Sequence, residues 1–192
     1  MAHVFDPKKM AKLDNPERRK SMPPEEILKI SGLKEGQYFV DIGAGIGYFS
    51  IPAAEIVGKN GIVYALDISG ELLEELDKRV FEKKIDNIKS IKIEANSFPL
   101  EKNSVDHVFL CNVYHEIDDE TVFLEKVKEI MGDGARFTII DWQKKSMVMG
   151  PPVDHRIDKL KVIKDLEKFH FEILEEMDYK EIFYIIRAQK KG

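Results

Sequence analysis

The sequence has a single cysteine, Cys111, in 192 residues. One cysteine excludes an internal disulfide and a zinc site built from several cysteines, and it is typical of proteins that work in a reducing compartment. The chain also has no apolar run near the roughly 18 to 20 residues that a bilayer-spanning helix needs. Its first residues, MAHVFDPKKM, lack the apolar core of a secretory signal. We therefore expect a cytoplasmic protein without a membrane span.

An excess of positive charge is also missing. The net charge is −5 and the pI is about 5.6, which argues against a broad nucleic-acid surface and makes nucleic acid an unlikely partner.

The length suits one domain with a full core, and we predict that domain over residues 25–192. Residues 1–24 form a predicted N-terminal arm, either a solvated tail or a lid whose cations attract an acidic substrate. Those cations are Lys8, Lys9, Lys12, Arg18, Arg19 and Lys20.

Residues 40–50 read VDIGAGIGYFS and are the most informative stretch of the chain. An apolar strand leads into Gly43, Gly45 and Gly47, and an apolar helix is predicted from Tyr48 to Val57. Glycines accept positive φ and let a ligand lie against the main chain. The N-terminus of a helix adds bare N–H donors and a partial positive charge. The pattern favours a nucleotide-type ligand over a tight turn with no ligand.

The spacing of these glycines narrows the type of ligand. In the dinucleotide fingerprint the third glycine falls three residues after the second, and here that position holds Tyr48. A pyrophosphate cofactor is therefore disfavoured. A nicotinamide-dependent oxidoreductase remains as an alternative.

The order of apolar runs and turn signals predicts the fold class. Five strands, at residues 38–42, 62–66, 88–93, 105–111 and 137–140, alternate with helices or loops, and Ser69, Asp118 or Asp119, and Asp158 are expected helix caps. Two closing strands, 171–177 and 182–188, are so close in sequence that they must be antiparallel. We predict five βα units in an α/β fold: a Rossmann-like doubly wound, mostly parallel seven-stranded sheet with an antiparallel C-terminal hairpin. Gly132 and Gly134 are expected to end the helix before the fifth strand.

Polar residues stand where the predicted parallel strands end, at the edge where ligands bind in open α/β sheets. Any one of them could be structural, because polar residues often end strands. Their coincidence with the glycine turn indicates a binding site. They are Asp41, Asp67, Glu94 with Ala95, Asn112 and Asp141.

The glycine stretch, together with IEANSFPLEKNSVDHVF at residues 93–109, resembles the motifs of class I S-adenosylmethionine-dependent methyltransferases. The resemblance covers residues 33–190. Within the family, the sequence is most similar in type to the type 11-like branch, which acts on small molecules. The resemblance implies S-adenosylmethionine as cofactor, an enzyme that transfers its methyl group, and a small-molecule acceptor. Arsenite is disfavoured as that acceptor, because the related arsenite enzymes use several cysteines.

The resemblance also implies how the cofactor is held. Asp41, Gly43 and the Asn112 carbonyl would surround the methionine end, and Gly45 and Gly47 would bind the cofactor from the same turn. Asp67, with Ile68 beside it, would accept hydrogen bonds from the ribose, and Glu94 with the Ala95 N–H would recognise the adenine edge. Aspartate is the more usual residue at the position of Glu94.

Two residues after the fourth strand are the predicted catalytic groups. His115 is the candidate base because its ordinary pKa lies near neutrality, although a hydrogen-bonded structural histidine is an equally good interpretation. Glu116 would orient it or face solvent. Tyr114, Trp142, Met147, Met149 and His155 are candidate substrate contacts. Asp141, Asp154 and His155 lack a tight ligand spacing, so no metal is predicted.

A third hypothesis is a module that binds S-adenosylmethionine without chemistry. The oligomeric state and the acceptor atom are not predicted.

Overall fold

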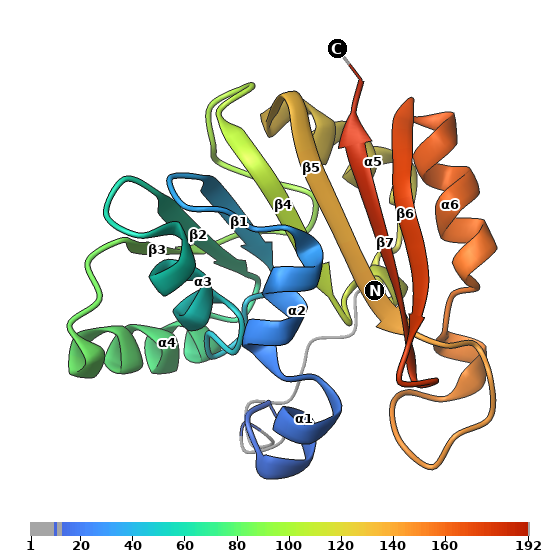
Figure 1. The fold of residues 1–192 in the computed structure, drawn as a ribbon, viewed down its shortest axis with the longest axis horizontal. Coiled ribbons are helices and arrows are strands. Elements are labelled where there is room, and N and C mark those ends of the chain that lie inside the picture. Colours follow the sequence, from blue (N-terminus) through green and yellow to red (C-terminus); the bar gives the residue numbers. More distant parts are fainter. Residues whose placement is uncertain (1–9, 11–12, 192) are drawn as a thin grey trace.

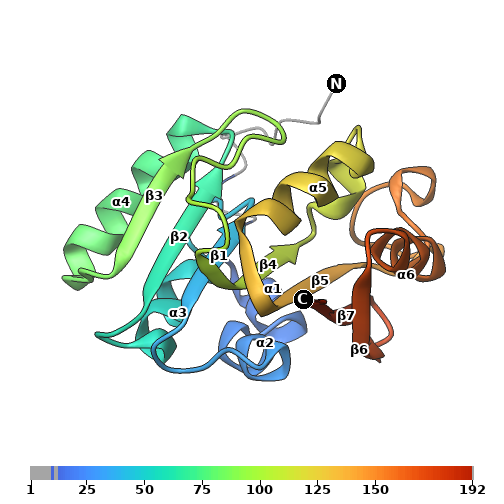
Figure 2. The ribbon, with the colours of Figure 1, turned by 90° about the horizontal axis from the view of Figure 1, so that it is seen from above.

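The structure is a computed structural model that describes residue 10 and residues 13–191. It contains a seven-stranded sheet of order β3-β2-β1-β4-β5-β7-β6, with helices on both faces (Figure 1, Figure 2). The strands are β1 (Tyr38–Ile42), β2 (Ile62–Asp67), β3 (Ile88–Lys92), β4 (Val105–Cys111), β5 (Met131–Trp142), β6 (Phe171–Tyr179) and β7 (Phe183–Lys190). The α-helices are α1 (Pro16–Ser21), α2 (Pro24–Ser31), α3 (Ser50–Val57), α4 (Gly70–Lys83), α5 (Glu120–Ile130) and α6 (Lys159–Lys168).

The strand pairing confirms the predicted fold class. β1 pairs in parallel with β2 and β4, and β4 pairs in parallel with β5. β7 is antiparallel to both β5 and β6. The chain passes from β1 outward to β2 and β3, then returns to β4 on the other side of β1. That reversal creates the switch point where ligands bind in such sheets.

Two apolar layers hold the helices on the sheet, because successive strand residues point to opposite faces. On one face, Phe39 and Phe109 are fully buried with α2 and α3. On the other, Val40 and Val108 are fully buried with α5 and α6. Figure 2 shows the two sets of helices on opposite sides of the sheet. Ser69, Asp119 and Asp158 cap α4, α5 and α6 as predicted, each accepting a backbone N–H.

The fifth strand differs from its prediction. Gly132 and Gly134 lie inside β5 and do not end a helix. α5 ends at Ile130 because Met131 takes an extended backbone, with φ −72° and ψ 133°, while its N–H still bonds to the Val127 carbonyl. The pairing of β4 with β5 shifts register between Val105 and His107, which accommodates the extra residues.

One further local prediction was wrong. α3 begins at Ser50, because Tyr48 and Phe49 still belong to the turn. Residues 93–104 between β3 and β4 form a loop that contains Pro99, as expected, so four of the five predicted βα units have a helix.

Part of the predicted arm, residues 1–9, 11 and 12, lies outside the described residues. The described part runs from Leu13 through α1 and lies beyond the carboxyl ends of the strands (Figure 1). Met22, at its end, is 1% exposed and packs in the core with α2 and α3. Within the described chain, none of the helices is both long and apolar enough to cross a bilayer.

Candidate active site

The glycine turn is a rigid support for the site. Gly43, Gly45 and Gly47 have φ values of +75°, +55° and +84°, which a residue with a Cβ rarely adopts. A Cβ at Gly43 would clash with the Val113 side chain, and one at Gly47 would clash with Leu76 of α4. Gly47 therefore serves helix packing, while Gly45 faces more open space.

The amides of this turn are not bare, contrary to the expectation from the sequence. The N–H groups of Gly43 and Ala44 both donate to the Leu66 carbonyl, at 2.8 and 3.0 Å. Gly47 N donates to the Ala44 carbonyl at 3.0 Å. Gly45 N donates to Asp67 Oδ2 at 2.8 Å. These bonds hold the turn in one conformation.

Asp67, at the end of β2, is held in place from two sides. Its second oxygen, Oδ1, accepts the N–H of Ser69 at 2.9 Å, and the residue is 7% exposed. Burial raises the pKa of Asp67, against the effect of these backbone hydrogen bonds. The backbone N–H of Ile68 also bonds to this carboxylate. A carboxylate has about four acceptor positions, so about one remains for a ribose hydroxyl.

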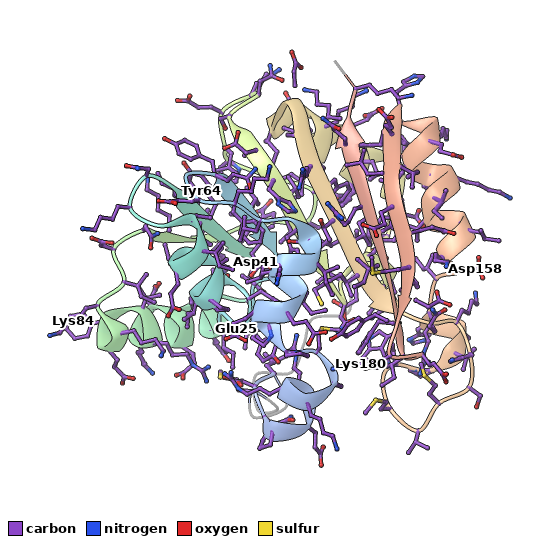
Figure 3. All side chains as sticks on the ribbon, viewed as in Figure 1. Glu25, Asp41, Tyr64, Lys84, Asp158 and Lys180 are labelled. Atoms are coloured by element: carbon purple, nitrogen blue, oxygen red, sulfur yellow. The ribbon has the colours of Figure 1, made fainter. Side chains whose placement is uncertain are left out.

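Asp41 is the buried carboxylate of the site. It is 2% exposed and accepts the Ser50 hydroxyl at 2.6 Å. Burial raises the pKa of Asp41 to about 6, opposed by the Ser50 hydrogen bond and reinforced by the charge of Asp67. The positive charge of Arg18 also acts against the rise. Figure 3 labels Asp41 near the middle of the molecule.

Asn112 follows β4 and has a buried side-chain acceptor that none of the described residues satisfies. Its backbone takes φ +58°, and its N–H donates to the Ile140 carbonyl at 2.8 Å. Its side-chain oxygen, Oδ1, is buried and has no hydrogen-bond partner. A buried acceptor without a partner costs about 1–3 kcal/mol, and a cationic ligand would supply the missing donor.

The predicted adenine contacts, Glu94 and Ala95, lie at the same edge of the sheet as the ends of β1 and β2. Ile93 N donates to the Asp67 carbonyl at 2.9 Å, which aligns the end of β3 with that of β2. Glu94 and Ala95 follow and are both exposed. Ile68 is half-buried and packs on the core. Their roles in cofactor binding stay predictions.

His115 and Asp141 form a hydrogen-bonded pair at the ends of β4 and β5. His115 Nδ1 lies 2.8 Å from Asp141 Oδ1, and the backbone N–H of His115 donates to Asp141 Oδ2 at 3.1 Å. The Trp142 N–H also donates to Asp141 Oδ1, at 2.8 Å. Because a carboxylate only accepts, Nδ1 carries the proton and Nε2 is left as the basic nitrogen.

The electrostatics of the pair suit a base. Burial opposes the charged imidazolium, but the hydrogen bond and charge of Asp141, with a contribution from Glu116, outweigh burial and raise the pKa of His115. The side chains of His115 and Asp141 are 8% and 1% exposed. This arrangement is the one in which a buried carboxylate fixes the tautomer of a histidine and stabilises its protonated form.

Asp141 is the orienting residue that the sequence interpretation missed. Glu116 was the candidate because it follows His115, but its Oε1 lies 3.9 Å from Nε2, beyond hydrogen-bond distance. The sequence contained a usable signal, since β4 and β5 were both predicted to end at the same edge. Two adjacent strands of a parallel sheet can place their last residues closer together than two residues that are adjacent in sequence.

Arg156 organises the loop after β5, a role that sequence reasoning also missed. The residue is 2% exposed, and its guanidinium lies 5.7 Å from the Trp142 ring. It donates to four backbone carbonyls, those of Pro151, Gln143, Lys145 and Met149. A buried charge needs such partners, so we assign Arg156 to loop structure.

Several other candidates have structural or surface positions. Tyr114 is fully buried, and its hydroxyl donates to Asp165 at 3.1 Å. Met149, Asp154 and His155 are exposed. Within residue 10 and residues 13–191, His, Cys, Asp and Glu form no cluster suited to a metal ion.

The site as a whole fits a cationic cofactor. Acceptors gather along one edge of the sheet, and Asn112 Oδ1 is without a partner. Asp67 retains acceptor capacity for a ribose. A sulfonium and an ammonium group are the kind of charge that these oxygens stabilise.

Comparison with known proteins agrees with this geometry. Residues 33–186 match the family model described as "Methyltransferase domain". A "SAM dependent methyltransferase" from Aquifex aeolicus is 32% identical, with a TM-score of 0.92, and the alignment covers 97% of this chain and 99% of that one. A demethylmenaquinone methyltransferase of Geobacillus sp. strain WCH70 is 24% identical over 124 residues, 65% of this chain and 53% of the relative.

The chain thus spans about half the length of that curated relative. The fold also occurs in the [4+2]-cyclase SpnF, which has 13% identity and a TM-score of 0.76, over 87% of this chain and 80% of that chain. The family match and the Aquifex structure confirm the predicted family and its cofactor, S-adenosylmethionine. The chain belongs to the class I S-adenosylmethionine-dependent methyltransferases.

Proposed function

We propose that this protein methylates a small molecule whose acceptor atom carries a proton, with His115 as the general base. The observation that carries the proposal is the His115–Asp141 pair, 2.8 Å apart at the end of β4. It lies three residues beyond Asn112, whose buried oxygen has no partner. A base and a cation-binding acceptor are therefore close in the chain and at the same edge of the sheet.

The cofactor would be held by the residues predicted for it. Asp67 would accept a hydrogen bond from a ribose hydroxyl, and Glu94 with the Ala95 N–H would bind the adenine. Asp41 and Asn112 would face the cationic methionine end, against the turn made by Gly43, Gly45 and Gly47. When bound, the cofactor supplies a methyl group already activated on a sulfonium and leaves as neutral S-adenosylhomocysteine.

The residues of the chain supply positioning and proton transfer. His115 Nε2 accepts the proton from the acceptor atom while that atom gains the methyl group, and the protonated imidazole is stabilised by Asp141. Proton transfer of this kind contributes roughly 10²- to 10⁴-fold to a rate. Holding the acceptor in line with the methyl group contributes the rest. Glu116, 3.9 Å from Nε2, adds negative charge beside the imidazolium.

A phenolic or quinol-type acceptor fits this chemistry best. A phenol has a pKa near 10, so it needs a base to become a good nucleophile at neutral pH. The Geobacillus relative is named a demethylmenaquinone methyltransferase, which supports a quinol-type substrate. Another relative, from Haemophilus ducreyi, is named a C-methyltransferase, so the methyl group goes either to a ring carbon or to the oxygen of such a substrate. The cytoplasmic location and the division into arm and domain stay predictions.

Ligand-dependent stability tests the cofactor half of the proposal. At 100 times its dissociation constant, S-adenosylhomocysteine is expected to stabilise the protein by about 2.7 kcal/mol. For a chain of this length that equals a rise in unfolding temperature of about 5–10 °C, measured by thermal shift. NADH is the matched negative control. Stabilisation by NADH and not by S-adenosylhomocysteine would contradict the proposal.

Methyl transfer itself is tested with radiolabelled S-adenosylmethionine and a panel of catechols, naphthols and quinols. Transfer to at least one phenolic acceptor is expected. Binding of the cofactor with no transfer to any of them would favour a binding module without chemistry, or a different reaction on the same fold.

A further inference from the structure

The described part of the N-terminal arm lies directly against the glycine turn. Leu13 Cδ1 is 3.5 Å from the position that a Cβ on Gly45 would occupy. Asp14 forms an ion pair with Arg79 of α4 at 3.1 Å. The arm therefore contacts both the turn and the helix beyond it.

The other end of the arm is fixed as well. The Tyr48 hydroxyl donates to the Met22 carbonyl at 2.8 Å, and the Cys111 sulfur lies 3.3 Å from that of Met22. Because contacts hold both Leu13 and Met22, the segment between these residues is fixed in position beside the glycine turn.

Arg18 is the cation that this arrangement brings to the site. Its guanidinium lies 4.3 Å from the centre of the Tyr48 ring and donates to the Leu13 carbonyl at 2.7 Å. Tyr48 directly follows the last glycine of the turn. The pKa values of two buried groups at the strand ends, Asp41 and Cys111, are raised mainly by burial, and the charge of Arg18 acts against both rises.

The acceptor groups at the sheet edge suit the cationic parts of the cofactor but not its negatively charged α-carboxylate. Asp41, Asp67 and Asn112 Oδ1 are acceptors, which suit the sulfonium, the ammonium and the ribose. The α-carboxylate of the cofactor needs a donor of positive charge instead. Arg156 is unsuited because its guanidinium already bonds to four carbonyls.

We propose that Arg18 binds the α-carboxylate of S-adenosylmethionine, so that residues 13–22 cover the methionine end of the cofactor. This inference rests on the proposed function and names a binding residue outside the motifs from which the cofactor site was predicted. A guanidinium presents several donors in a plane that matches a carboxylate, and the cation–π contact with Tyr48 helps to hold the guanidinium of Arg18 in place.

The test compares two ligands that differ only in this carboxylate: S-adenosylhomocysteine and its decarboxylated analogue. Calorimetric titration of Arg18→Gln is expected to show roughly 10- to 100-fold weaker binding of S-adenosylhomocysteine. Binding of the decarboxylated analogue is expected to change little. Arg18→Lys should recover part of the loss, because it restores the charge without the planar fork.

Arg19→Gln is the matched control. Arg19 lies on the same helix, but its guanidinium bonds to Asp14 at 2.7 Å. We expect this variant to bind both ligands like the wild type. Equal weakening of both ligands in Arg18→Gln would overturn the inference, since the residue would then act only through the fold of the arm. Unchanged binding of both would overturn it too.

These outcomes are separate from failure of the proposed function. If the wild-type protein binds neither ligand, the proposed cofactor site is wrong. If it binds S-adenosylhomocysteine tightly but Arg18→Gln shows no carboxylate-dependent loss, only the role of Arg18 is wrong. The unfolding temperature of each ligand-free variant shows whether the fold is intact.

Discussion

Replacing His115 by alanine is expected to lower kcat by roughly 10²- to 10⁴-fold, the usual contribution of a positioned general base. The reason is that Nδ1 is bound to Asp141 at 2.8 Å, which leaves Nε2 as the acceptor for the substrate proton. Affinity for S-adenosylhomocysteine, measured by titration calorimetry, is expected to change little, because no proposed cofactor contact involves the imidazole.

The pH dependence of kcat/KM separates a catalytic from a structural His115. Asp141 and Glu116 raise the pKa of His115 above its ordinary value of 6.5 despite burial, so activity should rise with pH through a midpoint above 6.5. In Asp141→Asn the negative charge is lost, the pKa falls, and the midpoint should move to lower pH. The maximal rate should fall as well, because the imidazolium is less stabilised.

Two results would contradict this role. Unchanged turnover in His115→Ala would show that His115 is not the general base. A wild-type pH profile in Asp141→Asn would show that Asp141 does not set the pKa of the catalytic group. Glu116→Gln is expected to lower the rate less than Asp141→Asn does, because Glu116 makes no hydrogen bond to the ring at 3.9 Å. A larger loss in Glu116→Gln would restore the orienting role that the sequence first suggested.

Asp41→Asn is expected to make the ligand-free protein more stable at neutral pH while weakening cofactor binding. Burial raises the pKa of Asp41 to about 6 in the folded protein, above its value in the unfolded chain. The folded state therefore binds this proton more tightly, and stability falls as the pH rises from about 4 to about 6. A shift of about two pKa units corresponds to about 3 kcal/mol.

Urea unfolding at pH 4 and at pH 7 measures this effect. Relative to the wild type, Asp41→Asn should gain on the order of 2–3 kcal/mol between the two pH values. Asparagine keeps an oxygen that accepts the Ser50 hydroxyl, so packing is conserved. Asp86→Asn, at an exposed position before β3, is the control and should show no such gain. If the unfolding free energies of both variants changed equally between pH 4 and pH 7, ionisation of Asp41 would cost the folded protein little stability.

The same variant tests the link between stability and function. The charge of Asp41 is unfavourable in the ligand-free protein and favourable next to a cationic cofactor. Weaker binding of S-adenosylhomocysteine together with higher stability is therefore the expected combination, as in other binding sites that trade stability for function. Unchanged affinity would place Asp41 outside the cofactor contacts.

Much of the fold could be read from the chain because its signals are local. Helix caps at Ser69 and Asp158, and the extent of β4, depend on residues a few positions apart, and they agree with the structure. The start of β5 did not, because Gly132 and Gly134 were read as a helix end. Pairing with β4 and its register shift extended the strand through both glycines, and such pairing involves residues far away in sequence.

The site shows the same division. Asp41, Asp67 and Asn112 were predicted as cofactor contacts because they stand at the ends of strands, and the ends of parallel strands meet. For Asn112 the predicted atom was the backbone carbonyl, whereas the buried acceptor without a partner is the side-chain Oδ1. Glu116 was expected either to orient His115 or to face solvent, and the hydrogen bond to His115 is made instead by Asp141, 26 positions away. The expected bare amides were also wrong, since the turn uses them to hold itself and Asp67 together.

The residues alone determined the architecture and the row of acceptors, because hydrophobic periodicity and glycine spacing act over short distances along the chain, while the cofactor was implied by the resemblance of the motifs to a known family. The tertiary structure alone decided which carboxylate is bound to His115, that Arg156 secures the loop, and that Arg18 lies over the ring of Tyr48. These last facts depend on contacts between segments that folding brings together, and a linear pattern does not record them.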